Sequence, residues 1–351
     1  MKLRVLFVFF ILLSFANVLS QTQTITFNYT GSFQIWVVPS CVTSINAVVA
    51  GAKGGGLNGG SGARITANIP VTPGQILYIY CGGMGTQGNN SGGWNGGGNG
   101  YSSTGSLIYS SWGGGGASDI RIGGQTLANR VIVGGGGGGR SGGSSQVCGG
   151  AANCNNGAQG CSTYGQGGGG GTQASGGFGG APWAGVPTGG QAGTLGQGGN
   201  GGFWQTASGG GGGGGRFGGG GGGNDGCCTG GNGGGGGGGG SSLIPVGGTC
   251  IGANNSGNGY VTITYTSVNL TVNPTSTNVT CFGLCNGTAS SNVTTPGATF
   301  LWSPGGQTTS SISNLCPGTY TVTVNVNGCT ATGTVTITQP PQVTIGPIQH
   351  N

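Results

Sequence analysis

The sequence has little of the chemistry that enzymes use. Charged residues make up 3% of the 351 residues, with two acids, Asp119 and Asp225, no glutamate, and one histidine, His350. Enzymes need groups that transfer protons, attack substrates or coordinate metal ions. We therefore expect no catalytic residue, no cofactor site and no metal site, and the composition favours a structural or binding role.

The few ionic residues do not suggest another function. Asp119 lies two residues before Arg121 in the segment SDIRI. A single carboxylate without a second acid, histidine or nucleophile is expected to cap backbone amides or to pair with Arg130. Asp225, beside Cys227, is interpreted in the same way. The glycine runs lack the GK[S/T] signature of a phosphate-binding loop. Nucleic-acid binding is excluded because the basic residues beyond position 20 are scattered. These are Lys53, Arg64, Arg121, Arg130, Arg140 and Arg216.

Long hydrophobic runs are missing except at the N-terminus. Residues 5–15, VLFVFFILLSF, follow Lys2 and Arg4 and precede the small residues Val18 and Ser20. This order is typical of a secretory signal peptide, and the run is shorter than the roughly 20 apolar residues of a membrane-spanning helix. We expect residues 1–20 to be a signal peptide, the mature chain to have no transmembrane segment, and the protein to be secreted and associated with the cell surface.

Glycine, in contrast, is abundant, with 95 residues that lie mainly between positions 51 and 240. Such a composition is typical of disorder, because glycine loses much backbone freedom on folding. Strand-like segments on both sides of the tract and cysteines within it favour order instead. Chains without side chains can also pack as extended threefold helices through N–H···O and Cα–H···O contacts. We favour packed polyglycine helices, and the lack of a G-X-Y period excludes collagen.

Alternation of apolar and polar residues predicts strands, and no amphipathic helix follows the signal. A change in composition near residue 267, where glycine gives way to Thr, Val, Asn and Ser, predicts a domain boundary. We expect a glycine-rich domain at 21–266, a linker at 267–272, a second module at 273–340, and a tail or further repeat at 341–351. The predicted strands are 25–29, 33–37, 45–50, 64–69, 75–80, 118–122, 130–133, 260–265, 299–302, 319–326 and 332–338.

Twelve cysteines in an exported chain indicate disulfides rather than metal sites, because C-x-x-C pairs and nearby histidines are missing. We expect Cys227 and Cys228 to pair with different partners, since a bridge between adjacent residues strains the peptide between them. Spacing alone leaves the pairings of the first eight cysteines open. These are Cys41, Cys81, Cys148, Cys154, Cys161, Cys227, Cys228 and Cys250; the other four are Cys281, Cys285, Cys316 and Cys329.

Residues 22–266 resemble a known glycine-rich domain, found in bacterial exported proteins and in the extracellular part of anaplastic lymphoma kinase receptors. The resemblance implies a jelly-roll-like β-sandwich from which loops extend as a polyglycine-II helix bundle. Receptor signalling does not carry over, because no transmembrane or kinase segment is present. The matching strings, in chain order, are FNYTG (27–31), VVP (37–39), VTSI (42–45), VTPGQILYIYCGG (71–83), GGWNGGG (92–98), GGGGASDIRI (113–122), RVIVGGGGGG (130–139) and NGYVTITY (258–265).

Residues 281–340 resemble the SprB repeat, a small immunoglobulin-like β-sandwich module of bacterial surface adhesins. Trp302, expected in the core, and the strings PGTY (317–320), NGC (327–329) and TQP (338–340) carry the resemblance. It implies the disulfides Cys281–Cys329 and Cys285–Cys316. The Asn-Gly turn before Cys329 is a strong hairpin signal, which is consistent with Cys329 returning beside the first strand.

Four tryptophans within glycine-rich loops are candidates for surface binding. Glycine neighbours cannot bury them locally, so they either contact sugars or proteins or fill the interface with the sandwich, and we expect packing for at least two. They are Trp94, Trp112, Trp183 and Trp204. We predict an adhesin-like, non-enzymatic protein whose partner is an extracellular polysaccharide or protein surface. The alternatives are a structural matrix or surface-layer component without a specific ligand, and a polysaccharide- or ice-binding protein.

Overall fold

The computed structural model describes residues 19–344 except 103–108, 145, 163, 184–187, 206, 227–232 and 327. These residues form β-strands, extended loops and a short 3-10 helix, η2 (Leu127–Asn129). Within this part of the chain, no helix has the length and apolar character needed to cross a membrane. The chain divides into two compact units. One is Thr22–Tyr265, called here the glycine-rich unit, and the C-terminal unit begins at Thr266.

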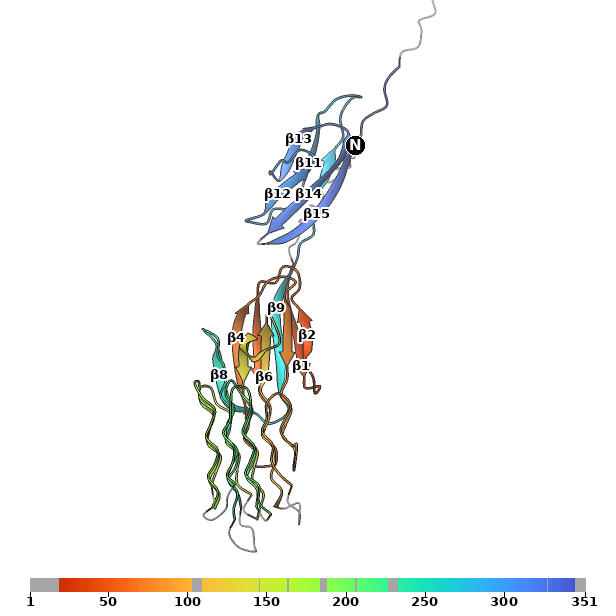
Figure 1. Cartoon of the computed structure of the whole chain (residues 1–351). Helices are drawn as coiled ribbons and strands as arrows, with labels where there is room; N and C mark the ends of the chain where they lie inside the picture. The colour runs from red at the N-terminus through yellow and green to blue at the C-terminus, as the bar shows by residue number, and fades with distance from the viewer. Residues whose placement is uncertain are drawn as a thin grey trace, which may run out of the picture. The chain divides into compact units, whose positions relative to one another are not determined.

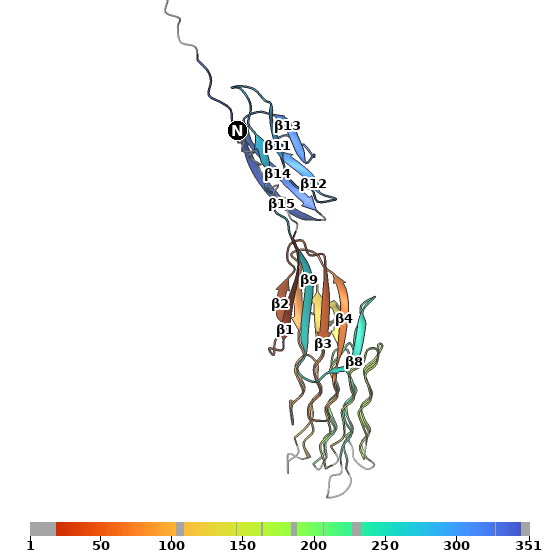
Figure 2. The same cartoon turned by 180° about the vertical axis from the view of Figure 1, so that it is seen from behind.

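Two sheets form the sandwich-like part of the glycine-rich unit (Figures 1 and 2). The alternating pattern of the sequence has the expected effect, since the inward residues Ile45, Ile65, Leu77, Ile120 and Ile263 are fully buried in one core. One sheet has the order β1 (Leu19–Asn28), β9 (Tyr260–Asn269), β3 (Ser44–Ala50), β4 (Gly62–Pro70), β8 (Thr249–Asn255); the other has β2 (Gln34–Val37), β5 (Ile76–Tyr80), β6 (Ser118–Ile122), β7 (Arg130–Gly134).

Glycine-rich segments extend from one end of these sheets and run side by side as a bundle (Figure 1). Their backbone hydrogen bonds repeat every three residues. In residues 218–223, consecutive amides donate hydrogen bonds to three different neighbouring segments. Amides that are three residues apart donate to the same segment. The amides of Gly218 and Gly221 donate to the carbonyls of Thr194 and Gln191. Those of Gly219 and Gly222 donate to Gly213 and Gly210, and those of Gly220 and Gly223 donate to Gly169 and Gln166.

The carbonyls of the same segment accept bonds from three further neighbours, so residues 218–223 are enclosed by six segments. The carbonyls bind amides at 177 and 180, at 199 and 202, and at 235 and 238. A Cβ at any position from 218 to 223 would lie under 3.0 Å from a backbone atom of a neighbour. Glycine is therefore required here because of close backbone approach, and the bundle's interior is held by main-chain hydrogen bonds.

The C-terminal unit consists of two three-stranded sheets around a second core. Trp302 is 1% exposed and its Nε1 donates to the carbonyl of Thr309 at 3.0 Å, which confirms the expectation that Trp302 is a core residue. One sheet has the order β10 (Thr275–Thr277), β11 (Gly287–Ser290), β13 (Ser311–Leu315); the other has β12 (Thr299–Ser303), β14 (Gly318–Val326), β15 (Cys329–Ile337).

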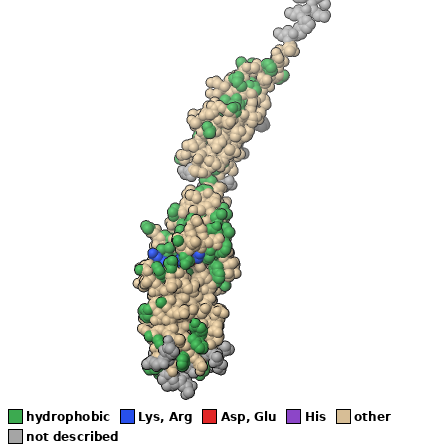
Figure 3. Space-filling view, viewed as in Figure 1, with side chains coloured by type: hydrophobic (Ala, Val, Ile, Leu, Met, Phe, Trp, Pro, Cys, Tyr) green, Lys and Arg blue, Asp and Glu red, His purple; other side chains and the backbone are tan. Residues whose placement is uncertain are grey.

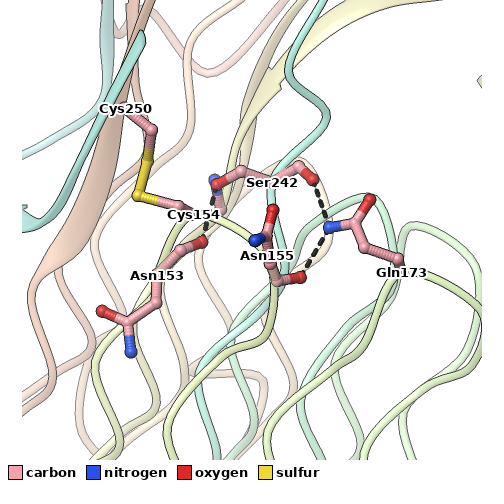
Figure 4. Close-up of a disulfide and its surroundings, with 7 residues drawn as sticks. Asn153, Cys154, Asn155, Gln173, Ser242 and Cys250 are labelled. Atoms are coloured by element: carbon pink, nitrogen blue, oxygen red, sulfur yellow. Dashed lines mark hydrogen bonds between the residues drawn. A yellow bond between two sulfur atoms is a disulfide. The ribbon is translucent and has the colours of Figure 1, made fainter.

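Two disulfides join parts of the glycine-rich unit, Cys148–Cys161 and Cys154–Cys250. The second links a glycine-rich loop to edge strand β8, beside a small polar network (Figure 4). In that network Gln173 Nε2 donates to the carbonyl of Ser242 at 2.8 Å, and Ser242 Oγ donates to the carbonyl of Asn153 at 3.1 Å. Cys41 is also disulfide-bonded, whereas Cys81 is a buried free thiol. The prediction for Cys227 and Cys228 concerns residues outside the described part.

In the C-terminal unit, the expected Cys285–Cys316 bridge is present, but the expected Cys281–Cys329 bridge is wrong. Cys281 is an exposed free thiol, and Cys329 is disulfide-bonded to another cysteine. The loop after Cys281 lies near the end of β15, where the Gly283 amide donates to Gln339 Oε1. Cys329 starts β15 and is therefore separated from that loop by the length of a nine-residue strand, roughly 30 Å.

Candidate binding surface of the glycine-rich unit

The acid–base pair of the SDIRI segment is buried and fully hydrogen-bonded. Arg121 Nε donates to Asp119 Oδ1 at 2.6 Å, and Asn95 Nδ2 donates to Asp119 Oδ2 at 2.9 Å. The pair between Asp119 and Arg130 that the sequence suggested as one alternative is not formed. Instead, Arg130 Nη1 donates to the carbonyl of Gly215 at 2.8 Å. Burial lowers the pKa of Arg130. With both carboxylate oxygens occupied, Asp119 ties β6 to the loop that carries Asn95.

Trp94 belongs to a stack of aromatic rings beside this pair. Its ring stacks on Tyr80 at 5.6 Å between centroids, and the tilted ring of Tyr29 lies 6.5 Å away between centroids. The Arg121 guanidinium lies 3.5 Å from the centroid of the Tyr80 ring. Burial raises the pKa of the Tyr80 hydroxyl. Trp94 therefore packs against the sheet, as expected for some of the loop tryptophans.

Trp112 also packs inside the unit. The Arg140 guanidinium lies over its ring at 5.4 Å, and burial lowers the pKa of Arg140. The Trp112 amide donates to the carbonyl of Arg140 at 3.1 Å, and its own carbonyl accepts from the amide of Gly211 at 3.0 Å. The indole Nε1 is buried and has no partner among the described residues. Trp112 thus occupies a position within the bundle and offers little surface to a ligand.

The end of the bundle that lies away from the sheets is called here the distal end. The chain turns there, and backbone bonds link Gly142 to Ser208 and Asp225 to Ala207. Gly142 lies eight residues beyond Gly134, where β7 ends, so this end is roughly 25 Å from the sheets if the chain rises about 3.1 Å per residue. On the face shown in Figure 3, Lys and Arg side chains lie away from this end, where hydrophobic side chains appear.

Trp183 and Trp204 belong to the distal end. Trp183 is 40% exposed and meets the ring of Tyr164, itself 42% exposed, edge to face at 5.4 Å. Trp204 is half-buried, and its carbonyl accepts a bond from Ser208 Oγ at 3.2 Å. Of the four candidate tryptophans, Trp183 is exposed and the other three are half-buried.

An open cavity of about 510 Å³ lies at the distal end. Phe203, 40% exposed, contacts Tyr101 edge to face at 5.6 Å. Asn89, Asn90 and Asn99 supply the polar groups. The cavity is lined by Asn89, Asn90, Asn99, Gly100, Tyr101 and Phe203, and none of these residues is charged.

Hydrogen bonds hold the cavity wall in place. Asn89 Oδ1 accepts from the Ser102 amide at 2.9 Å, and Asn99 Oδ1 accepts from the Gly92 amide at 2.9 Å. The carbonyl of Phe203 accepts from the buried Asn224, whose Nδ2 lies 2.7 Å away. Because these bonds come from several segments of the bundle, Phe203 and the side chains of Asn89 and Asn99 are held on a rigid support.

Sequence reasoning identified Trp183 but missed this cavity. Tyr101 and Phe203 are about a hundred positions apart, and only the packing of their segments brings them together, through the bond from the Gly201 amide to the carbonyl of Asn99. The adjacent amides Asn89 and Asn90 were the one local signal.

Neither a known family model nor a curated protein matches the chain. The resemblances to the glycine-rich receptor domain and to the SprB repeat stay predictions.

Proposed function

We propose that this chain is a secreted, cell-surface-associated, non-enzymatic protein with an adhesin-like role. The glycine-rich unit is its binding head, and the distal end of the bundle is the binding surface. The observation that carries the proposal is the cluster of uncharged aromatic and amide side chains at an end whose supporting segments are joined by main-chain hydrogen bonds. Aromatic residues with amide or hydroxyl neighbours are typical of recognition surfaces.

In this proposal the bundle is a set of polyglycine-II helices on a jelly-roll-like sandwich. Support comes from the three-residue repeat of the backbone bonds, because a threefold helix directs every third amide to the same side. The six neighbours of residues 218–223 are what hexagonal packing of such helices requires. Every interior amide and carbonyl then resists displacement, so the bundle is stiff and holds its distal end away from the sheets.

The C-terminal unit is proposed to be an SprB-like, immunoglobulin-like spacer. Its support is the pair of three-stranded sheets around Trp302, together with the Cys285–Cys316 bridge that the resemblance implied. Such a module adds length between a binding head and the surface that carries it, and needs no ligand of its own.

Adhesion of beads coated with residues 21–340 tests this function. We expect coated beads to be retained on extracellular polysaccharide or on cell surfaces more than beads coated with albumin, and Trp183→Ala to reduce retention. Phe178→Ala is the matched control, because Phe178 is 53% exposed but lies along the bundle, where its carbonyl accepts from the amide of Gly169, and not at the distal end. If beads coated with the wild-type protein are retained no better than albumin beads on any of these surfaces, the adhesin-like role is rejected. The structural matrix alternative is then favoured.

A second candidate, binding to an ordered surface such as ice, is favoured by the outer face of the five-stranded sheet. Uncharged side chains there form regular rows across the strands, with Thr24 Oγ1 3.1 Å from Thr264 Oγ1 and Thr26 Oγ1 3.0 Å from Thr262 Oγ1. One row is Thr24, Thr264, Asn46, Asn68; the next is Thr26, Thr262, Val48, Thr66, Thr249.

The rows have the fixed spacing of a sheet, about 4.8 Å between strands and about 6.7 Å between alternate residues along a strand. A regular array of this kind can match a crystalline ligand. Thermal hysteresis of the purified protein tests the candidate, with Thr262→Lys as the variant that interrupts the face. Wild-type activity equal to that of albumin rejects it.

A further inference from the structure

We infer that the distal cavity binds an uncharged polysaccharide, through stacking on Phe203 and hydrogen bonds from Asn89, Asn90 and Asn99. This inference rests on the proposed function and specifies its ligand. Its basis is the combination of an exposed aromatic ring and amide donors in a cavity of about 510 Å³ without a charged lining residue.

The amide groups are arranged to donate. The Oδ1 atoms of Asn89 and Asn99 already accept backbone amides, which fixes the orientation of both side chains. Their Nδ2 groups have no hydrogen-bond partner among the described residues, and neither does the side chain of Asn90. Asn90 has φ of 53°, a left-handed conformation that Asn tolerates better than most residues. Three donors are thus available for ligand oxygens, and sugar hydroxyls accept such bonds.

The aromatic pair supplies the apolar part. Tyr101 supports Phe203 edge to face, so that Phe203 keeps its orientation while 40% of its surface is exposed. Sugar rings present C–H groups on their faces and hydroxyls at their edges. A ring stacked on Phe203 therefore has its hydroxyls directed toward the surrounding amides, which is the usual division between apolar contact and orienting polar groups in a ligand site.

The charge pattern restricts the ligand to neutral polymers. No Lys or Arg lines the cavity to pair with uronic acid, sulfate or phosphate groups, and no Asp lines it to pair with amino sugars. An anionic or cationic polysaccharide would gain nothing from its charges here and would lose part of their hydration. A peptide ligand is the competing class of macromolecule and is an outcome of the test.

The experiment measures binding of residues 21–340 to soluble β-glucan, α-glucan and galactomannan by titration calorimetry, with alginate as the anionic comparison. At least one neutral polymer is expected to bind and alginate is not. Phe203→Ala should weaken binding at least about tenfold through the lost stacking area. Asn90→Gly keeps the left-handed backbone, removes the amide, and should weaken binding roughly fivefold.

Two further variants make the result specific. Asn99→Asp keeps the oxygen that accepts the Gly92 amide but replaces the donor group, and it should weaken binding at least as much as Asn90→Gly. Phe178→Ala removes an exposed ring outside the cavity and should leave affinity within about twofold. Thermal melting of each variant shows that the unit remains folded.

The outcomes separate this inference from the proposed function. Binding that Phe203→Ala and Asn90→Gly leave unchanged in folded protein overturns the cavity as the site. Retention of beads on cells without any polysaccharide binding, and with loss of retention after protease treatment of those cells, rejects the neutral polysaccharide but retains the adhesin. Loss of both activities in the wild-type protein rejects the inference and the proposed function together.

Discussion

A single methyl group in the interior of the bundle should destabilise the glycine-rich unit strongly. We consider Gly221→Ala. The amide of Gly221 donates to the carbonyl of Gln191 at 2.8 Å, and its carbonyl accepts from the amide of Gly180 at 2.8 Å. A Cβ at position 221 would overlap the carbonyl group of Asn200. That group belongs to a neighbouring backbone, which cannot move by changing a side-chain rotamer.

The expected size follows from two terms. Forcing a methyl group into a filled interior costs about 1–3 kcal/mol. The displacement that relieves the overlap lengthens at least one buried backbone bond, and an unsatisfied buried group costs about 1–3 kcal/mol more. The free energy of unfolding should therefore fall by roughly 2–6 kcal/mol, against which the lower entropy of alanine in the unfolded chain offsets less than about 1 kcal/mol.

The assay is denaturant unfolding followed by tryptophan fluorescence, with Gly257→Ala as the matched control. A Cβ at Gly257 would have no atom within 4 Å and the residue needs no left-handed conformation. This control should change the free energy of unfolding by less than about 1 kcal/mol. Equal midpoints for the two variants would refute the close backbone packing on which the reasoning depends.

Three further predictions concern order, thiols and disulfides. Amides of residues 218–223 should be strongly protected in hydrogen exchange of the oxidised protein, and free exchange there would contradict a packed bundle. Cys281 should react with maleimide in the native protein at pH 7, whereas Cys81 should react only on unfolding, because burial raises the pKa of the Cys81 thiol to about 12. The Cys154–Cys250 bridge closes a loop of sequence separation 96, and the Cys148–Cys161 bridge one of separation 13. If loop entropy dominates, serine replacement of the first bridge should lower the unfolding free energy by about 2 kcal/mol more than replacement of the second. Equal losses would reject that account.

Much of the strand layout could be predicted from alternation alone. The eight strands expected in the glycine-rich unit are all present, although β1 begins at Leu19, six residues before its predicted start, and β9 ends at Asn269, four residues beyond its predicted end. Strand β8 (Thr249–Asn255) was missed, because TCIGANN contains one large apolar residue, Ile251, and lies at a sheet edge with little burial. A strand that is held by pairing with β4 and by the Cys154–Cys250 bridge has no need of an apolar face.

Predictions that depended on which distant segments meet succeeded less often. The Cys281–Cys329 pairing failed because β15 separates the two cysteines by its length, and the hairpin signal before Cys329 carried no information about where the first loop lies. The distal cavity was missed for the same reason. Asn99, Tyr101 and Phe203 meet only because their segments are neighbours in the bundle.

The sequence by itself determined the all-β character, the inward residues of the strands, the scarcity of charge and the extent of the glycine tract. These properties follow from side-chain type and from period, which are local. The tertiary structure alone decided which glycine segments are neighbours, which cysteines pair in the glycine-rich unit and which side chains meet at the distal end. The physical reason is that every glycine presents the same amide and carbonyl, so backbone bonding can stabilise a bundle without specifying the order of its segments. That order is set by the parts of the chain that carry specific side chains, which are the turns, the disulfides and the strands that flank the glycine segments.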